Sequence, residues 1–220
     1  MPKESFASDQ RYGESLLRKY EKKYLEPLVL KMPQWLKSYH LTLSSVIWSL
    51  LVILFSYFAR EDIRWMWLVS FCILLQYFSD YFDGCLGRYR KEGLIKWGYY
   101  MDHFLDYVFL SSIFLGYLML VDNFYKIHVF LLLVVLVGFM INSFLYFAIS
   151  HKFKYSYMRI EPTEGRLLLI FLNSAIVIYS KKVLENSLIY FLVFFVIVLI
   201  YFIYKTQKEI WSLDIEESSR

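Results

Sequence analysis

The sequence predicts an all-α integral membrane protein with six transmembrane helices and an N-terminal amphipathic helix on the membrane surface. Of its 220 residues, 58% are hydrophobic, and the mean hydropathy of +0.42 is typical of a membrane protein. Most of the apolar segments approach the roughly 20 residues that a helix needs to cross a bilayer. The four prolines lie outside all of them, so uninterrupted helices are expected. The six segments are 41–59, 64–82, 99–121, 127–150, 166–180 and 186–204.

The chain divides into three parts. Residues 1–40 form an N-terminal segment in which apolar and charged residues recur at helical spacing, a pattern typical of a helix that lies on a membrane surface. Pro27 and Pro33 break this segment into pieces. Residues 41–204 form the six-helix transmembrane domain, and residues 205–220 form a polar tail.

The distribution of lysine and arginine predicts the orientation. Alternate loops and both termini hold 19 of the 24 basic residues, and the opposite loops hold 5. By the positive-inside rule, both termini face the cytoplasm. The membrane is then the cytoplasmic membrane of a bacterium or archaeon, or the endoplasmic reticulum. The basic residues are scattered over juxtamembrane loops, which favours lipid headgroups as partners and gives no sign of nucleic-acid binding.

Four aspartates lie within 27 residues, between long apolar segments. Asp80 and Asp83 share one face of a helix, and Asp102 and Asp106 share a face of the next, because residues three or four apart lie together. Carboxylates at a membrane boundary are costly, so they indicate function. If the two faces meet, four like charges need counter-charges, which two divalent cations would supply. Carboxylate oxygens suit Mg²⁺, Mn²⁺ or Ca²⁺.

Glycines and an arginine accompany the aspartates. Gly84 and Gly87 lie on the same arc as Asp80, where they remove side chains and let a bulky group approach the backbone. Arg88 completes this arc and is suited to hold a phosphate. Gly98 precedes Asp102 by one helical turn.

This pattern resembles the signature of the CDP-alcohol phosphotransferase family: Asp-x-x-Asp-Gly-x-x-Ala-Arg, eight or nine residues, then Gly-x-x-x-Asp-x-x-x-Asp. Gly87 stands where the family usually has alanine. Thr42, at the start of the first apolar segment, is similar to a threonine that the family has there, although the usual Pro-Asn pair before it is absent. The residues that match the signature are Asp80, Asp83, Gly84, Arg88, Gly98, Asp102 and Asp106.

The resemblance implies a Mg²⁺- or Mn²⁺-dependent transferase of phospholipid synthesis, with two ions, in which residues 41–204 are the catalytic domain. An acceptor hydroxyl would attack the phosphate of a CDP-alcohol, and CMP would leave. Asp106 would be the catalytic base and a metal ligand, beside the metal ligands Asp80, Asp83 and Asp102. The resemblance also implies a homodimer with the active site facing the cytoplasm. The substrate would contact Thr42, Gly84, Gly87, Arg88 and Gly98.

The substrates stay open. The donor is CDP-diacylglycerol with a polar alcohol as acceptor, or CDP-choline or CDP-ethanolamine with diacylglycerol as acceptor. Two other functions are alternatives: an intramembrane prenyltransferase with a Mg²⁺-diphosphate site, and a non-catalytic membrane scaffold or cation-binding protein.

Several other residues have two interpretations. Arg159 and Arg166 either surround the second substrate or belong to a helix start capped by Thr163. The loop after Arg88 is either solvated or contacts the substrate phosphate. His103 is expected to be packed or hydrogen-bonded. Interhelical hydrogen bonds are expected for Asn142, Ser143, Asn173 and Ser174.

Overall fold

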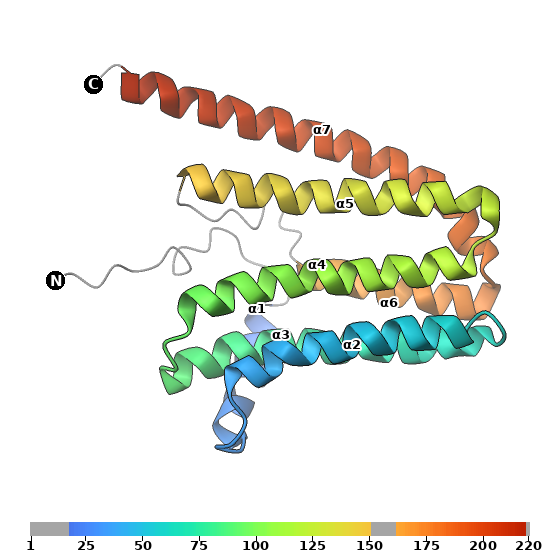
Figure 1. Cartoon of the computed structure of the whole chain (residues 1–220), viewed down its shortest axis with the longest axis horizontal. Helices are drawn as coiled ribbons and strands as arrows, with labels where there is room; N and C mark the ends of the chain where they lie inside the picture. The colour runs from blue at the N-terminus through green and yellow to red at the C-terminus, as the bar shows by residue number, and fades with distance from the viewer. Residues whose placement is uncertain (1–17, 151–161, 219–220) are drawn as a thin grey trace.

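The computed structural model describes residues 18–150 and 162–218. Within these ranges the regular secondary structure is all helical, with short turns between the helices (Figure 1). The all-α prediction is therefore confirmed. The long helices run side by side as a bundle, and a short N-terminal collar packs at one end. The helices are α1 (Arg18–Tyr24), α2 (Ser38–Phe58), α3 (Met66–Arg90), α4 (Ile95–Leu120), α5 (Asn123–Ser150), α6 (Pro162–Tyr179) and α7 (Lys182–Ser218), with 3₁₀ turns η2 (Glu26–Lys31) and η3 (Ile63–Trp65).

Four helices, α2, α4, α5 and α7, are long and apolar enough to cross a membrane. The other two long helices, α3 and α6, are more polar: α3 carries aspartates and arginines in its second half, and the first turn of α6 carries Glu164 and Arg166. They lie alongside the apolar helices (Figure 1). The count of six spanning helices thus stays a prediction. Each of the six apolar segments overlaps one of α2–α7, but α3 runs on to Arg90 and α7 runs on to Ser218, beyond the predicted ends at 82 and 204.

Helix α2 contacts both α3 and α4 through small side chains. Ser45, Ser49 and Ser56 are buried along one side of α2. A Cβ added to Gly116 of α4 would lie 2.3 Å from the Oγ of Ser56, so only glycine permits this approach. Small residues at a helix crossing bring two backbones close together, which suits packing inside a membrane. The crossing aligns α4 with α2 and α3, and the site lies farther along α3 and α4.

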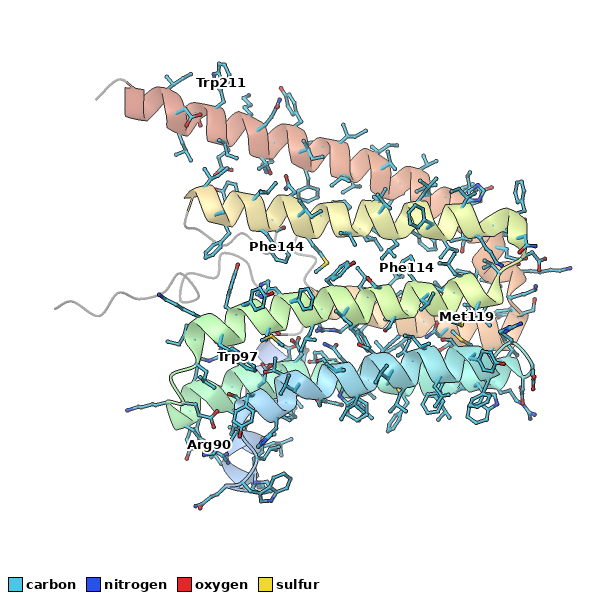
Figure 2. The ribbon with its side chains drawn as sticks, viewed as in Figure 1. Arg90, Trp97, Phe114, Met119, Phe144 and Trp211 are labelled. Atoms are coloured by element: carbon cyan, nitrogen blue, oxygen red, sulfur yellow. The ribbon has the colours of Figure 1, made fainter. Side chains whose placement is uncertain are left out.

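A tight turn joins α3 to α4. Lys91 ends α3 in the left-handed conformation (φ 53°), and Gly93 follows with φ 76°, a region that glycine enters at little cost. Arg90 and Trp97 mark this end of the bundle in Figure 2. The turn connects the end of α3 to the start of α4, and both helices pack against α2.

The N-terminal collar packs on α3. Val29 of η2 is buried in a cluster with Cys85 and Leu86 of α3, and Glu21 of α1 accepts a 2.7 Å hydrogen bond from the Tyr77 hydroxyl. Pro27 lies in the first turn of η2, so the predicted break at this proline is confirmed. An amphipathic helix on the membrane surface stays a prediction for this segment.

Buried polar residues link the helices away from the aspartates. The Tyr117 hydroxyl donates to Asn173 Oδ1 at 2.7 Å, joining α4 to α6, and Asn142 donates to Thr206 at 3.2 Å, joining α5 to α7. The prediction of interhelical hydrogen bonds is confirmed for the two asparagines. It is wrong for Ser143 and Ser174, whose hydroxyls donate to carbonyls one turn earlier in their own helices, an arrangement open to short hydroxyl side chains.

Candidate active site

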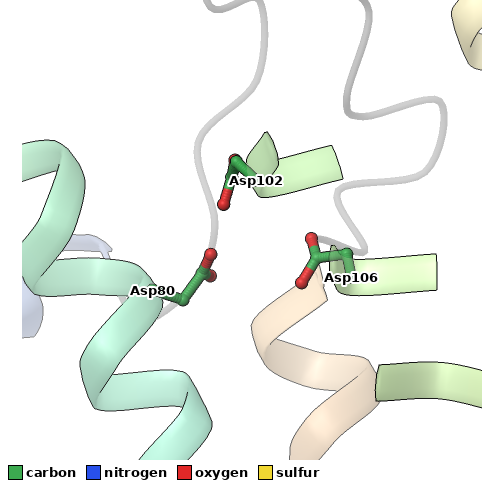
Figure 3. Close-up of side chains that lie close together, drawn as sticks. All are labelled: Asp80, Asp102 and Asp106. Carbon is green, nitrogen blue, oxygen red and sulfur yellow. The ribbon is translucent and has the colours of Figure 1, made fainter. Parts of the chain in front are cut away.

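Three of the four aspartates converge from two helices. Asp80 of α3 and Asp102 and Asp106 of α4 each offer one oxygen, and these oxygens lie within 4.8 Å of one another. Their side chains point toward a common centre in Figure 3. The spacing of four residues places Asp102 and Asp106 on one face of α4, and their carboxylates reach toward Asp80 of α3, a helix that packs with α4 on α2. We refer to Asp80, Asp102 and Asp106 as the carboxylate triad.

Arg166 of α6 is bound directly to the triad. One guanidinium nitrogen donates to Asp80 Oδ2 at 2.8 Å, and the other donates to Asp106 Oδ1 at 2.9 Å. The Arg166 side chain is only 11% exposed to solvent. Sequence reasoning placed this residue beside a second substrate or in a helix start and missed its pairing with the triad. The signal in the sequence that could have indicated this pairing was a single arginine at the boundary of an apolar segment, with acidic residues next to it.

Thr163 does not cap α6. The helix begins at Pro162, which places Thr163 inside the first turn, so the capping interpretation is wrong. Proline suits the first helical position because its fixed φ matches the helix and it needs no hydrogen-bond partner there. Arg159 lies outside the described residues.

The fourth aspartate, Asp83, has a different environment. It is buried, and its Oδ2 accepts a 2.8 Å hydrogen bond from the hydroxyl of Thr42 in α2. Among the described residues, the group of converging oxygens contains the triad and not Asp83. Thr42, expected to contact substrate, is thus in contact with an aspartate of the motif.

Gln76 of α3 contacts Asp106, and the sequence analysis did not predict this contact. Its amide nitrogen donates to Asp106 Oδ1 at 3.3 Å, the same oxygen that Arg166 contacts. Gln76 is 1% exposed, and its Oε1 has no hydrogen-bond partner among the described residues. It lies one helical turn before Asp80, so a single polar residue at that spacing was the available signal.

The glycines of the motif have unequal surroundings. A Cβ at Gly84 would lie 3.3 Å from an Arg88 guanidinium nitrogen, because the exposed Arg88 side chain folds back over Gly84. A Cβ at Gly87 would make ordinary contact with Ser38 at 3.5 Å, which leaves room for the alanine usual in the family. At Gly98 the added atom would meet nothing within 4 Å.

His103 lies beside the triad and is hydrogen-bonded within its own helix. Its Nδ1 forms a 2.7 Å hydrogen bond with the carbonyl oxygen of Tyr99, and its ring packs against Tyr99 and Phe144. The prediction of a packed, hydrogen-bonded histidine is therefore confirmed. The Nδ1 atom is also 3.6 Å from Asp102 Oδ2.

The loop after Arg88 holds the collar in place. Arg90 donates to the carbonyl oxygens of Met32, Pro33 and Leu36. Glu92 Oε2 accepts from the backbone N–H of Ser38 at 3.0 Å and from its hydroxyl at 2.6 Å. Partial burial opposes ionisation of Glu92, but the two hydrogen bonds from Ser38, with the charges of Lys37 and Arg90, outweigh it and hold the pKa of Glu92 below its ordinary value. These two side chains thus fasten the start of α2 to the end of α3.

The oxygens of the site suit a hard divalent cation. The triad supplies three carboxylates, and Gln76, whose Nε2 donates to Asp106, has a buried Oε1 with no hydrogen-bond partner among the described residues. Such a donor set fits Mg²⁺ or Mn²⁺ and lacks the sulfur and nitrogen ligands common at zinc sites. The residues present therefore fit the metal that the family resemblance implies.

A comparison with protein families decides the assignment. The family model for CDP-alcohol phosphatidyltransferase matches residues 35–203, which include α2 to α6 and most of α7. The chain belongs to the CDP-alcohol phosphatidyltransferase family. No curated protein and no solved structure matches the chain significantly.

As a member of this family, the chain is a membrane-associated transferase of phospholipid synthesis. Family membership and the four apolar helices together indicate a multi-pass membrane protein. The matched region contains the triad, Asp83, Thr42 and Arg166, so the contacts among these residues belong to the family domain.

Proposed function

We propose that this chain transfers a substituted phosphate group from a CDP-alcohol to an acceptor hydroxyl, with release of CMP and a requirement for Mg²⁺ or Mn²⁺. The observation that carries the proposal is the convergence of the triad oxygens within 4.8 Å, inside the region that matches the family. The prenyltransferase and scaffold alternatives have no such support, because neither accounts for the family match.

In this proposal Asp106 is the catalytic base. The acceptor oxygen attacks the phosphorus that bears the donor alcohol, and the bond from that phosphorus to the CMP oxygen breaks. The acceptor proton moves to a carboxylate oxygen of Asp106. Gln76 and Arg166 both donate to Oδ1 of Asp106, which supports Oδ2 as the oxygen that takes the proton.

Asp80, Asp83, Asp102 and Asp106 would hold the divalent ions, two in number. When bound, these ions would neutralise the diphosphate and the charge that develops on the departing CMP. Thr42 would keep Asp83 oriented through the hydrogen bond to its Oδ2. Asp83 thus enters the proposal as a ligand positioned by a neighbouring helix.

The remaining motif residues would position the donor. Gly84, Gly87 and Gly98 leave the backbone accessible, and the space around Gly98 supports a close approach there. Arg88 is exposed and lies over Gly84, so a donor phosphate could displace it from the helix surface and pair with its guanidinium group. The excess of basic residues in the loops at this end supports a site that faces the cytoplasm. A homodimer is part of the proposal by family resemblance.

The test is CMP release by purified protein with Mg²⁺. CDP-diacylglycerol and CDP-choline are offered separately, each with a mixture of polar alcohols and diacylglycerol as acceptors. We expect CMP from one donor, which also identifies the acceptor class. The Asp102→Asn variant should be inactive, and Asp62→Asn should be active, because Asp62 is exposed and pairs with Arg64 between α2 and α3. Folded protein that releases no CMP from either donor would contradict the proposal.

A further inference from the structure

Arg166 is the arginine that pairs with the triad in the described part of the chain. It comes from α6, a helix that carries none of the four aspartates, and reaches across to both α3 and α4. Its two hydrogen bonds are 2.8 and 2.9 Å long, and 11% of the side chain is exposed. Hydrogen bonds between charged groups at this distance are strong, and a partly buried site screens them less than bulk water does.

The charges of the triad and Arg166 determine how strongly the site attracts a divalent cation. Three carboxylates meet, and within residues 18–150 and 162–218 the guanidinium group of Arg166 balances one of their charges, which leaves two formal negative charges. That balance attracts a divalent cation. The same cation is repelled by a guanidinium group already bound to Asp80 and Asp106, because like charges a few ångströms apart interact strongly where water is limited.

We propose that Arg166 and the divalent cation compete for Asp80 and Asp106, so that Arg166 sets the affinity of the site for the metal. This inference rests on the proposed function of the triad as a metal site. The two hydrogen bonds of Arg166 go to Asp80 and Asp106, so Asp102 stays the carboxylate at which the cation first gains a ligand. As the cation gains Asp80 and Asp106, the guanidinium group gives up its bonds to them.

A consequence is that α6 changes partner when the metal binds. Arg166 is the charged link between α6 and the two helices of the motif, and its release exposes a guanidinium group at the edge of the site. The apparent affinity for the metal equals the intrinsic affinity multiplied by the fraction of molecules in which Arg166 has released the triad. Charge-assisted hydrogen bonds of this kind hold that fraction to between about a tenth and a hundredth.

The first experiment measures Mn²⁺ binding to the full chain in detergent, by titration with electron paramagnetic resonance of the free ion. We expect Arg166→Gln to bind Mn²⁺ about tenfold to a hundredfold more tightly than the unmodified protein. Arg166→Lys keeps the charge without the two-pronged geometry and should be intermediate. The matched control is Arg64→Gln, the same change at an exposed arginine that pairs with Asp62, and it should leave the affinity unchanged.

The second experiment needs no substitution. Phenylglyoxal modifies accessible guanidinium groups, and mass spectrometry reports the modification of Arg166 with and without Mn²⁺. Saturating Mn²⁺ should increase the modification of Arg166 and leave that of Arg64 unchanged. Modification of Arg166 that stays constant or falls would overturn the competition, as would an Arg166→Gln variant that is folded and binds Mn²⁺ no more tightly than the unmodified protein.

A separate variant distinguishes this inference from the proposed function. Asp102→Asn should weaken Mn²⁺ binding in both the unmodified and the Arg166→Gln backgrounds. If Asp102→Asn has no effect on Mn²⁺ binding, the triad is not the metal site and the proposed function fails with it. If Asp102→Asn weakens binding and Arg166→Gln does not strengthen it, the metal site stands and the competition alone is wrong.

Discussion

The hydroxyl of Thr42 donates a 2.8 Å hydrogen bond to Oδ2 of Asp83, and both side chains are buried. Thr42 lies on α2, whereas Asp83 and Asp80 lie on α3. Asp83 therefore depends for its orientation on a helix outside the aspartate motif. A buried carboxylate that loses its donor is costly, which makes this contact sensitive to substitution.

Replacing Thr42 with valine should lower kcat/KM for CMP release by about tenfold to a hundredfold, because Asp83 loses its donor while the shape of the side chain is kept. Thr42→Ser retains the hydroxyl and should stay within about threefold of the unmodified protein. Steady-state kinetics of both variants give the comparison. Equal losses in the two variants would mean that the methyl group, and not the hydrogen bond, matters.

Asp106→Asn should abolish turnover and leave binding of the CDP-alcohol donor largely intact, because the amide cannot accept the acceptor proton. Asparagine keeps the size of the side chain and can still accept from Gln76 and Arg166. Isothermal titration with the donor separates binding from turnover, with Asp62→Asn as the control. Loss of donor binding together with activity would assign Asp106 to metal binding and not to proton transfer.

Gly116→Ala should destabilise the protein by about 1–3 kcal/mol, because the added Cβ would lie 2.3 Å from Ser56 Oγ and 2.8 Å from Ser56 Cβ. Thermal unfolding followed by tryptophan fluorescence measures the change in Tm. Gly98→Ala is the control, since its Cβ meets nothing within 4 Å and the helix itself favours alanine. The double change Ser56→Gly with Gly116→Ala should recover most of the lost Tm.

Excess chelator should stop CMP release, and added Mg²⁺ or Mn²⁺ should restore it. Zn²⁺ should restore it poorly, because the triad offers only carboxylate oxygens. The assay is CMP release before and after chelation, with total metal content checked by mass spectrometry. Turnover that persists in protein shown to contain no divalent metal would contradict the role of the triad.

The helices and the shared faces of the aspartates could be predicted from the sequence, because both depend on local periodicity. Hydropathy places α2 to α7, and spacing by four places Asp102 and Asp106 together. The partners of those carboxylates are not local: Arg166 is 86 positions from Asp80, and Gln76 is 30 positions from Asp106. Which helix supplies the counter-charge depends on how α6 packs against α3 and how its side chains reach α4. The residue pattern within α6 does not predict that packing.

The contact between Glu92 and Ser38 predicts how stability depends on pH. Against the effect of burial, the hydrogen bonds from Ser38 and the charges of Lys37 and Arg90 hold the pKa of Glu92 below its ordinary value of 4.5, so the folded state favours the ionised carboxylate. A group whose pKa is lowered by folding stabilises the protein above its ordinary pKa, and that contribution is lost as the pH falls through the lowered value. The unmodified protein should therefore have a higher Tm than Glu92→Gln at neutral pH.

The difference in Tm between the unmodified protein and Glu92→Gln should shrink as the pH falls below 4.5, where protonated Glu92 becomes uncharged like glutamine. Thermal unfolding across this range measures the effect, and Ser38→Ala with and without Glu92→Gln isolates the contribution of the Ser38 hydroxyl. In the Ser38→Ala background, replacing Glu92 should have a smaller effect on Tm at neutral pH, because the hydroxyl bond is lost and the backbone N–H still donates to Glu92. A difference that is constant with pH would mean that Glu92 stabilises the junction of α2 and α3 through packing and not through its charge.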